Sequence, residues 1–332
     1  MFVLKKKRAE IVQKSQIDTT ALGTGVLNRA QANKFIDLII ENQRILNLIT
    51  TKKVDNAKGQ IDKINITTHV LRKQGSEGGE ETETSSPNVS SVNYDCQTVV
   101  ACFDLTTEAE EDNIEGKGFR KTLINGFSKA ISNDLAKLVW EGDSSLGSST
   151  AEEKLLRTFD GIHIKTQSCP NIVDANGTGV SLLLFKDLLA KLPKKYKTKG
   201  YKKNYRWLVS TNISEDMQYA YANRATPGGD SGWTGDLVLK PFGIIMEECP
   251  YLPEDLTIGT AATDGTFMLL ADPKDNMILF VRRKITFHYD FRPRKGKTEV
   301  TIYMRLDFEI PNLDGMAKAR SISCDSSTAY SG

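Results

Sequence analysis

Residues 71–88 read LRKQGSEGGEETETSSPN, a long polar, glycine-rich and acidic stretch between two segments that alternate like strands. IDKINITTHVLRK (61–73) precedes its tip and NVSSVNYDCQTVVACFDL (88–105) follows it, and both are rich in β-branched residues. Together they predict a long two-stranded hairpin, whose tip far exceeds the roughly two to five residues of ordinary hairpin loops. Two strands alone are marginal in water, so the hairpin needs a further surface that the neighbouring sequence does not supply.

The chain before the hairpin combines a basic arm with one helix. Residues 1–30 show no sustained period and predict an extended arm, and the apolar positions of 28–51 recur at three and four residues, which predicts an amphipathic helix. The arm's basic residues are Lys5, Lys6, Lys7 and Arg8.

A long helix is the clearest element after the hairpin. Thr107 and Glu110 fit a capping box, and acidic residues follow it where a helix N-terminus favours negative charge. Apolar residues then step by four and three over 119–141, and Gly142 ends the run. We expect a long amphipathic helix there.

The rest of the chain predicts a compact α+β unit and two long final strands. We expect strands at 159–167, 205–211, 242–248 and 266–272, and helices at 180–193 and around 215–224. The final strands, 277–291 and 299–310, are joined at RPRKGK (292–297).

Composition excludes several classes of protein. With 332 residues, 39% hydrophobic residues and a net charge of +2, the chain is globular and is not a strongly basic nucleic-acid binder. Its apolar runs are too short for a membrane span, and its N-terminus lacks a signal core, so we expect a soluble cytosolic product without a membrane partner. The five cysteines contain no CxxC pair, which argues against disulfides and zinc knuckles.

Motifs of catalysis are scarce. The three histidines, His69, His163 and His288, lie in predicted strands without metal-pair spacing, and no phosphate loop, dinucleotide turn or nucleophile elbow occurs. We therefore expect no enzyme activity, catalytic residue, metal or cofactor. The lysines and tyrosines of 194–207 could grip nucleic acid, or they could form a solvated loop.

Four cations crowd the last predicted turn: Arg292, Arg294, Lys295 and Lys297. They repel one another unless acids from elsewhere meet them. The turn is therefore either an intersubunit contact or an ordinary exposed turn.

The order of these pieces resembles the major capsid proteins of tailed bacteriophages, with the Hong Kong 97-type fold, over nearly the whole chain. LVSTNISEDM, LKPFGIIMEECPYLP and the closing RRKITFHYDFRP and TEVTIYMRLDFEIPNLDGMAKA look like that family's pattern. The resemblance implies an N-terminal arm and helix (1–55), an extended loop (56–106), a peripheral domain with the spine helix (107–172), an axial domain (173–276), and return strands of the peripheral domain with the C-terminus (277–332).

By this resemblance the hairpin's missing surface is another copy of the protein. The loop-tip acids and the basic arm would make intersubunit contacts, and the RPRKGK turn would meet its copies at local three-fold axes. The loop-tip acids are Glu77, Glu80, Glu81 and Glu83. Some relatives crosslink covalently between a loop lysine and an asparagine; Lys73 could serve as the lysine, but FRPRKGKTEV lacks the asparagine, so we expect no crosslink.

The resemblance implies that copies self-assemble into hexamers and pentamers of an icosahedral shell enclosing double-stranded DNA. Implied partners are a portal at one vertex, a separate scaffolding or decoration protein, and DNA contacted non-specifically. The implied location is the virion capsid, assembled in the host bacterial cytoplasm. An encapsulin-like nanocompartment shell of the same fold, packaging an enzyme, is the alternative.

Overall fold

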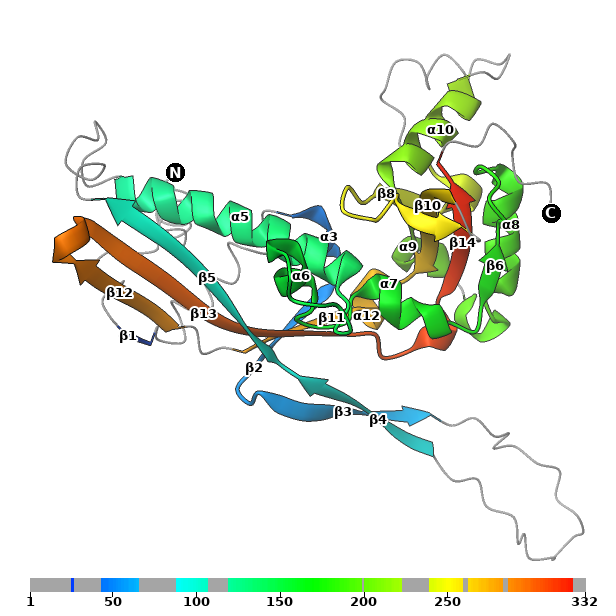
Figure 1. Ribbon diagram of the computed structural model, residues 1–332. Helices are drawn as coiled ribbons and strands as arrows, with labels where there is room; N and C mark the ends of the chain where they lie inside the picture. Colours follow the sequence, from blue (N-terminus) through cyan, green and yellow to red (C-terminus); the bar gives the residue numbers. More distant parts are fainter. Residues whose placement is uncertain are drawn as a thin grey trace, which may run out of the picture.

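The computed structural model describes residues 25–26, 43–65, 88–106, 119–198, 200–222, 239–258, 262–282 and 286–324. An elongated sheet with a long helix along one face adjoins a second, more compact sheet, and a two-stranded hairpin projects below both (Figure 1). The predicted α+β class is confirmed.

The described elements alternate between strands and short helices around one long helix. The strands are β1 (Gly25–Val26), β2 (Thr50–Val54), β3 (Lys58–Asn65), β4 (Asn88–Asp95), β5 (Gln97–Thr106), β6 (Ile172–Asp174), β7 (Arg206–Val209), β8 (Ile245–Glu248), β9 (Leu256–Ile258), β10 (Ala262–Ala271), β11 (Ile278–Arg282), β12 (Thr286–Arg292), β13 (Lys297–Glu309) and β14 (Ala317–Ser323). The α-helices are α3 (Arg44–Leu48), α5 (Phe119–Glu141), α6 (Ala151–Leu156), α7 (Ile162–Lys165), α8 (Leu182–Lys191), α9 (Tyr201–Asn204), α10 (Thr211–Ala222) and α12 (Pro273–Asn276). The 3-10 turns are η3 (Thr166–Ser168), η4 (Lys194–Tyr196), η5 (Pro241–Gly243), η6 (Pro293–Lys295) and η7 (Leu313–Gly315).

The first sheet is organised around β13. Its order is β1-β12-β13-β11-β2, and β5 pairs with β13 along the opposite edge from β12. Alternate β13 residues, Val300, Ile302 and Met304, are buried, because α5 lies along that face. Phe103 of β5 stacks on Phe127 of α5 with ring centroids 3.6 Å apart. The sheet therefore has one face in the core and one outer face.

The helix predicted at 119–141 is confirmed as α5, and Gly142 ends it. A Cβ on Gly142 would lie 2.3 Å from the carbonyl oxygen of Phe159, so glycine is needed where the returning chain crosses the helix end. The Gly161 amide donates to the Gly142 carbonyl at 2.8 Å. The strand predicted at 159–167 is wrong, because the chain instead forms α7 and η3 after this crossing.

The second sheet has the order β6-β14-β10-β7-β8, and β9 pairs with the first residues of β10. Phe267 and Leu269 of β10 face the core shared with α5, and Met268 and Leu270 face the core under α8. Because both faces are covered, β10 shows a continuous apolar run. The helices α8 and α10 and the strands β7, β8 and β10 lie where the sequence predicts them.

Three other predictions differ from the structure. The helix predicted to reach Thr51 ends at Leu48, because β2 begins at Thr50 and pairs in parallel with β11. The single strand predicted over 277–291 is two strands, β11 and β12. The closing strand β14 pairs with β6 and β10, so the end of the 277–332 segment lies in the second sheet.

Candidate functional site

The predicted contact residues fall into three groups, of which the structure describes one. The loop-tip residues Glu77, Glu80, Glu81 and Glu83 and the arm residues Lys5, Lys6, Lys7 and Arg8 lie outside the described residues. Arg292, Arg294, Lys295 and Lys297 lie together at the turn between β12 and β13, at the far end of the first sheet.

Acids of the same chain neutralise two of the four turn cations. Arg292 forms ion pairs with Asp290 (Nη2 to Oδ2, 2.9 Å) and Glu299 (Nε to Oε2, 3.3 Å). Lys297 pairs with Glu299 at 3.1 Å and with Asp104 of β5 at 2.5 Å, and the hydrogen bond to Asp104 raises the pKa of Lys297. For these two cations the acids come from cross-strand neighbours in the same sheet and not from another copy.

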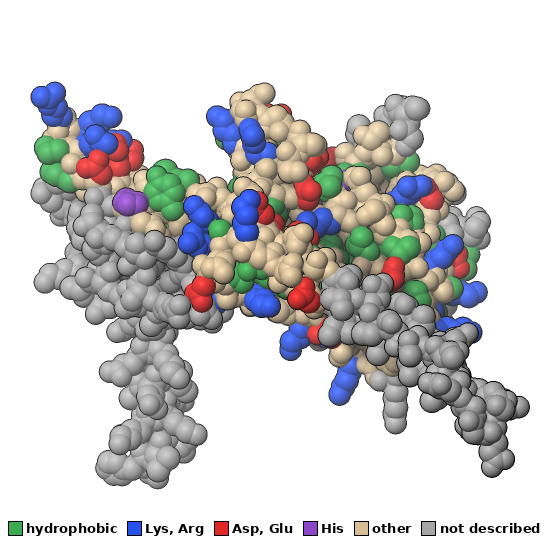
Figure 2. All heavy atoms as spheres, turned by 90° about the horizontal axis from the view of Figure 1, so that it is seen from below, with side chains coloured by type: hydrophobic (Ala, Val, Ile, Leu, Met, Phe, Trp, Pro, Cys, Tyr) green, Lys and Arg blue, Asp and Glu red, His purple; other side chains and the backbone are tan. Residues whose placement is uncertain are grey.

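Two turn cations remain available to a partner. Arg294 and Lys295 are exposed in η6, and neither forms an ion pair with any described residue. Gly296 closes the turn with a positive φ of 56°. Figure 2 shows cationic and acidic side chains side by side at this end of the molecule, with apolar side chains next to them.

The outer face of the first sheet carries exposed apolar side chains. On this face Val100 is 46% exposed and Tyr303 40%, and the two lie opposite each other in the ladder. Phe291, 55% exposed, lies opposite Thr298 near the turn, on the face of the sheet that carries Val300 and Ile302. His288 packs edge-on against Tyr303, with ring centroids 5.5 Å apart. Large exposed apolar side chains near a charged turn are typical of an interaction surface.

A small cluster holds the root of the projecting hairpin. Tyr94 of β4 stacks on Phe280 of β11, with centroids 4.4 Å apart and planes at 10°. Cys96 is buried beside Val54 and Phe280. Cys96 also marks the point where the strand predicted over 88–105 divides, because β4 pairs with β3 whereas β5 pairs with β13.

Asp307 anchors this root from β13. Its Oδ2 accepts from the Asp95 amide at 2.7 Å and its Oδ1 from the Phe308 amide at 2.8 Å. Asp307 is 6% exposed, and burial raises its pKa to about 6. The carboxylate therefore joins the hairpin to the central strand of the sheet.

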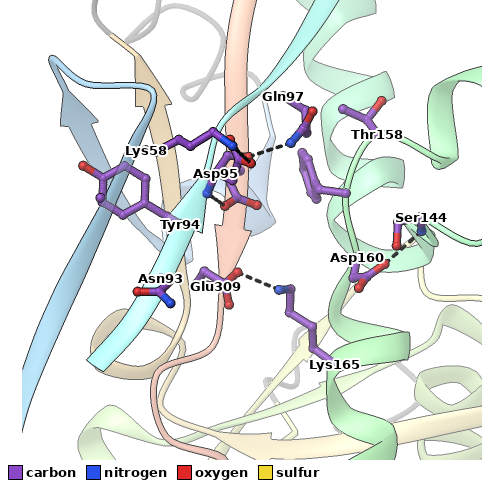
Figure 3. Close-up of a pocket in the computed structure, with 13 residues that line it drawn as sticks. Lys58, Asn93, Tyr94, Asp95, Gln97, Ser144, Thr158, Asp160, Lys165 and Glu309 are labelled. Atoms are coloured by element: carbon purple, nitrogen blue, oxygen red, sulfur yellow. Dashed lines mark hydrogen bonds and ion pairs between the residues drawn. The ribbon is translucent and has the colours of Figure 1, made fainter. Parts of the chain in front are cut away.

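A cavity of about 540 Å³ opens between the hairpin root and the loop that follows α5. Figure 3 shows Lys165 bonded to Glu309 across the cavity, and the side chain of Gln97 directed at Asp95. Lys58 pairs with Asp95 at 2.7 Å. These contacts connect the hairpin root to the first sheet and to α7, so the charged groups that line the cavity are paired with one another.

The tyrosines of the basic stretch 194–207 face inward. Tyr205 donates to the carbonyl of Gly315 at 3.0 Å, and Tyr196 accepts from Asn312 at 2.7 Å. Tyr205 is 6% exposed, and burial raises its pKa. These two rings are used in packing, which favours the solvated-loop interpretation over base stacking.

The described ranges contain no group of three or more His, Cys, Asp or Glu side chains that could hold a metal. His163 lies in α7 and packs on Phe267, and burial lowers its pKa to about 4. None of the helices in the described ranges has the length and apolar character to cross a membrane.

Sequence reasoning did not find the root cluster. A charge within an apolar run would have been a signal, but Asp307 alternates with Arg305 and Glu309 on the polar positions of β13, as an exposed residue would. The stacking of Tyr94 on Phe280 also left no signal, since the two residues lie far apart in the chain.

No family model matches the sequence. One curated protein, "Putative prophage capsid protein YqbE" of Bacillus subtilis (strain 168), is 27% identical over 316 residues, which cover 94% of this chain and 98% of that protein.

Protein shells are among the solved structures that the fold resembles. A chain of the satellite phage P4 procapsid with size determination (Sid) protein matches with a TM-score of 0.60 at 14% identity, covering 88% of this chain and 99% of that chain. A chain of the holo-SrpI encapsulin complex from Synechococcus elongatus PCC 7942 matches with a TM-score of 0.53 at 10% identity, covering 87% and 90%. The predicted capsid fold is confirmed.

Proposed function

We propose that this chain is a capsid protein of the tailed-bacteriophage type, with the Hong Kong 97-type fold, and that its copies form hexamers and pentamers of an icosahedral shell. The observation that supports this assembly is the projecting hairpin. Within the described residues β3 and β4 pair only with each other, although two strands alone are marginal in water. A neighbouring copy supplies the missing surface.

The turn at 292–297 is the second contact of this proposal. Arg294 and Lys295 have no ion-pair partner among the described residues, and we assign them to the contact near local three-fold axes. Exposed ion pairs contribute only about 0.2–1 kcal/mol each, but a closed shell repeats each contact many times. The acids at 77–83 and the basic arm at 5–8 are proposed as further contacts on charge alone.

The shell is proposed to enclose double-stranded DNA in a virion. We further propose a portal at one vertex, a separate scaffolding or decoration protein, and assembly in the cytoplasm of a bacterial host. The protein's role is structural, and the contact with DNA is non-specific.

An encapsulin-like compartment with an enzyme cargo is the second candidate. The structural likeness to the encapsulin chain favours it, and the sequence likeness to a prophage capsid protein favours the phage shell. The contents of shells purified from the native source distinguish them: nuclease-protected DNA supports the phage shell, and a stoichiometric enzyme supports the compartment.

The first test is electron microscopy in negative stain, with light scattering, on the full chain expressed alone. We expect closed shells or ring-shaped capsomers. The matched control is a variant without residues 74–86, which should stay folded and unassembled. A wild-type chain that remains monomeric at high concentration, with crowding agents and with its native scaffold, would contradict the proposal.

A further inference from the structure

A second cavity, of about 670 Å³, lies in the compact part of the molecule, away from both hairpins. β9 and β10 form one wall, β14 another, and His163 of α7 lines its inner part. Its lining combines apolar side chains, among them Leu256, Ile258 and Phe267, with cationic groups of β14. None of the contacts proposed above uses this cavity.

Lys318 lies at the inner end of this cavity and is only 4% exposed. Its Nζ donates to Thr166 Oγ1 at 3.0 Å and to the His163 carbonyl at 3.3 Å, and it lies 4.5 Å from the centre of the Phe267 ring. An ammonium has three N–H donors, and these two acceptors use two. No carboxylate among the described residues forms an ion pair with Lys318.

A buried charge without a counter-charge is costly, because desolvation is not offset by attraction. Burial lowers the pKa of Lys318 to about 8, and the charge of Arg320 adds to this effect. The neighbouring carboxylate, Asp174, is already bonded to Arg320, with Nε to Oδ2 at 2.8 Å. The cavity therefore has a surplus of positive charge that one further anion would balance.

The backbone beside the cavity is strained. The β10–β14 ladder shifts register between Thr266 and Met268, and Ser321 of β14 has a φ of +56°. Bulges and non-glycine residues with a left-handed backbone are enriched next to functional sites, where the conformational strain is part of how the site works. Ser321 itself lines the cavity, so the bulge shapes the wall next to Arg320.

We propose that this cavity binds a carboxylate, with Lys318 as its buried partner, Arg320 at its exposed end and apolar side chains around the rest of the ligand. A carboxylate oxygen accepts the free N–H of Lys318 and neutralises its charge. Two sources present this chemistry: a small organic acid, or an acidic side chain of a second copy of this chain.

The probe for this site is sodium hexanoate, whose carboxylate and short apolar chain match the two parts of the lining. The melting temperature of unassembled full-length protein is measured at pH 7 with increasing hexanoate, with sodium chloride and hexan-1-ol as controls. The matched variant is Lys318→Met, which keeps an unbranched side chain and removes the charge. When the hexanoate concentration is several times its Kd, we expect the melting temperature of the wild type to rise by about 1–2 °C and that of the variant to stay unchanged.

The same titration on closed shells separates the two sources. A shift in both subunits and shells indicates a small organic acid, and a shift in subunits alone indicates that a neighbour's carboxylate fills the cavity in the shell. Equal responses of wild type and Lys318→Met, or of hexanoate and hexanol, would overturn the proposal.

A second variant, at the exposed end of the cavity, tests the proposal even if Lys318→Met fails to fold. Arg320→Gln changes a side chain that is 57% exposed, and we expect it to weaken the hexanoate response without abolishing it. In the wild type the response should shrink as the pH rises above 8, because the ammonium of Lys318 loses its proton. His163, Cys169 and Asp174 also face this group, so a response independent of pH between 7 and 10 would count against Lys318 as the partner.

Discussion

The two long hairpins of this subunit are stabilised in different ways. β12–β13 has a neighbour on each edge, β1 and β5, and acids of its own sheet neutralise two of its four turn cations, Arg292 and Lys297. Within the described residues β3–β4 has no such neighbour and depends on a few side chains at its root. Perturbing the root should therefore affect the fold of the subunit, and perturbing the turn should affect only its contacts.

The largest effect on subunit stability is expected from Phe280→Ala at the root. Phe280 is fully buried and stacks on Tyr94, so truncation should lower the free energy of unfolding by about 3–5 kcal/mol in urea denaturation. The control is Phe291→Ala in β12, where the side chain is 55% exposed and the loss should stay near 0.5 kcal/mol. Equal losses in the two variants would remove the distinction between the hairpins.

Asp307 should make the stability of the root depend on pH. Its folded pKa of about 6 lies above the ordinary aspartate value of 3.8, so the native state binds more protons between these pH values. This group therefore makes the wild type less stable as the pH rises from about 4 to about 6, by on the order of 3 kcal/mol.

The comparison variant for this effect is Asp307→Asn, which does not titrate. Urea denaturation of both proteins at several pH values should show the wild type losing stability relative to the variant across that window. If the free energies of unfolding of the two proteins changed in parallel with pH, the pKa of Asp307 in the folded state would not be raised. Asparagine presents one oxygen instead of two, so the variant should also lose one of the two amide hydrogen bonds.

Deletion of residues 74–86 should leave the fold of the subunit nearly unchanged and prevent shell formation. The root cluster lies in the described residues outside this segment and does not depend on it. Circular dichroism and denaturation test the fold, and electron microscopy tests assembly. Insoluble protein would indicate that the hairpin belongs to an internal core.

The smallest effect on stability is expected at the turn. Reversal of Arg294 and Lys295 to glutamate should change the free energy of unfolding by less than about 0.5 kcal/mol, since neither side chain has an ion pair among the described residues. Shell closure should nevertheless fail, as measured by electron microscopy. The control Arg292→Gln breaks pairs within the subunit and should cost up to about 1 kcal/mol while shells still close.

Sequence periodicity predicts the elements whose structure is set locally. α5 and α8 have sustained apolar periods and residues that end a helix, Gly142 and Pro193, and both form as expected. The turn cations were also identified from sequence, because the strands on either side alternate clearly.

The elements that sequence misses are set by tertiary contacts. Residues 159–167 have the β-branched alternation of a strand, but the crossing at Gly142 and Gly161 turns them into a four-residue helix. Alternation also continues through Cys96, so nothing local indicates that β4 and β5 pair with different partners. The ion pair between Lys297 and Asp104 joins residues far apart in sequence and could not be foreseen.

The pairing of β2 with β11, and of β5 with β13, has a consequence for the order of events during synthesis. The strands that flank the projecting hairpin leave the ribosome early, but their partners, and Phe280 and Asp307 at its root, belong to the last third of the chain. Long-range pairing of this kind forms late in folding. A nascent or truncated chain therefore cannot orient the hairpin, and only a completed subunit can present it to a neighbour.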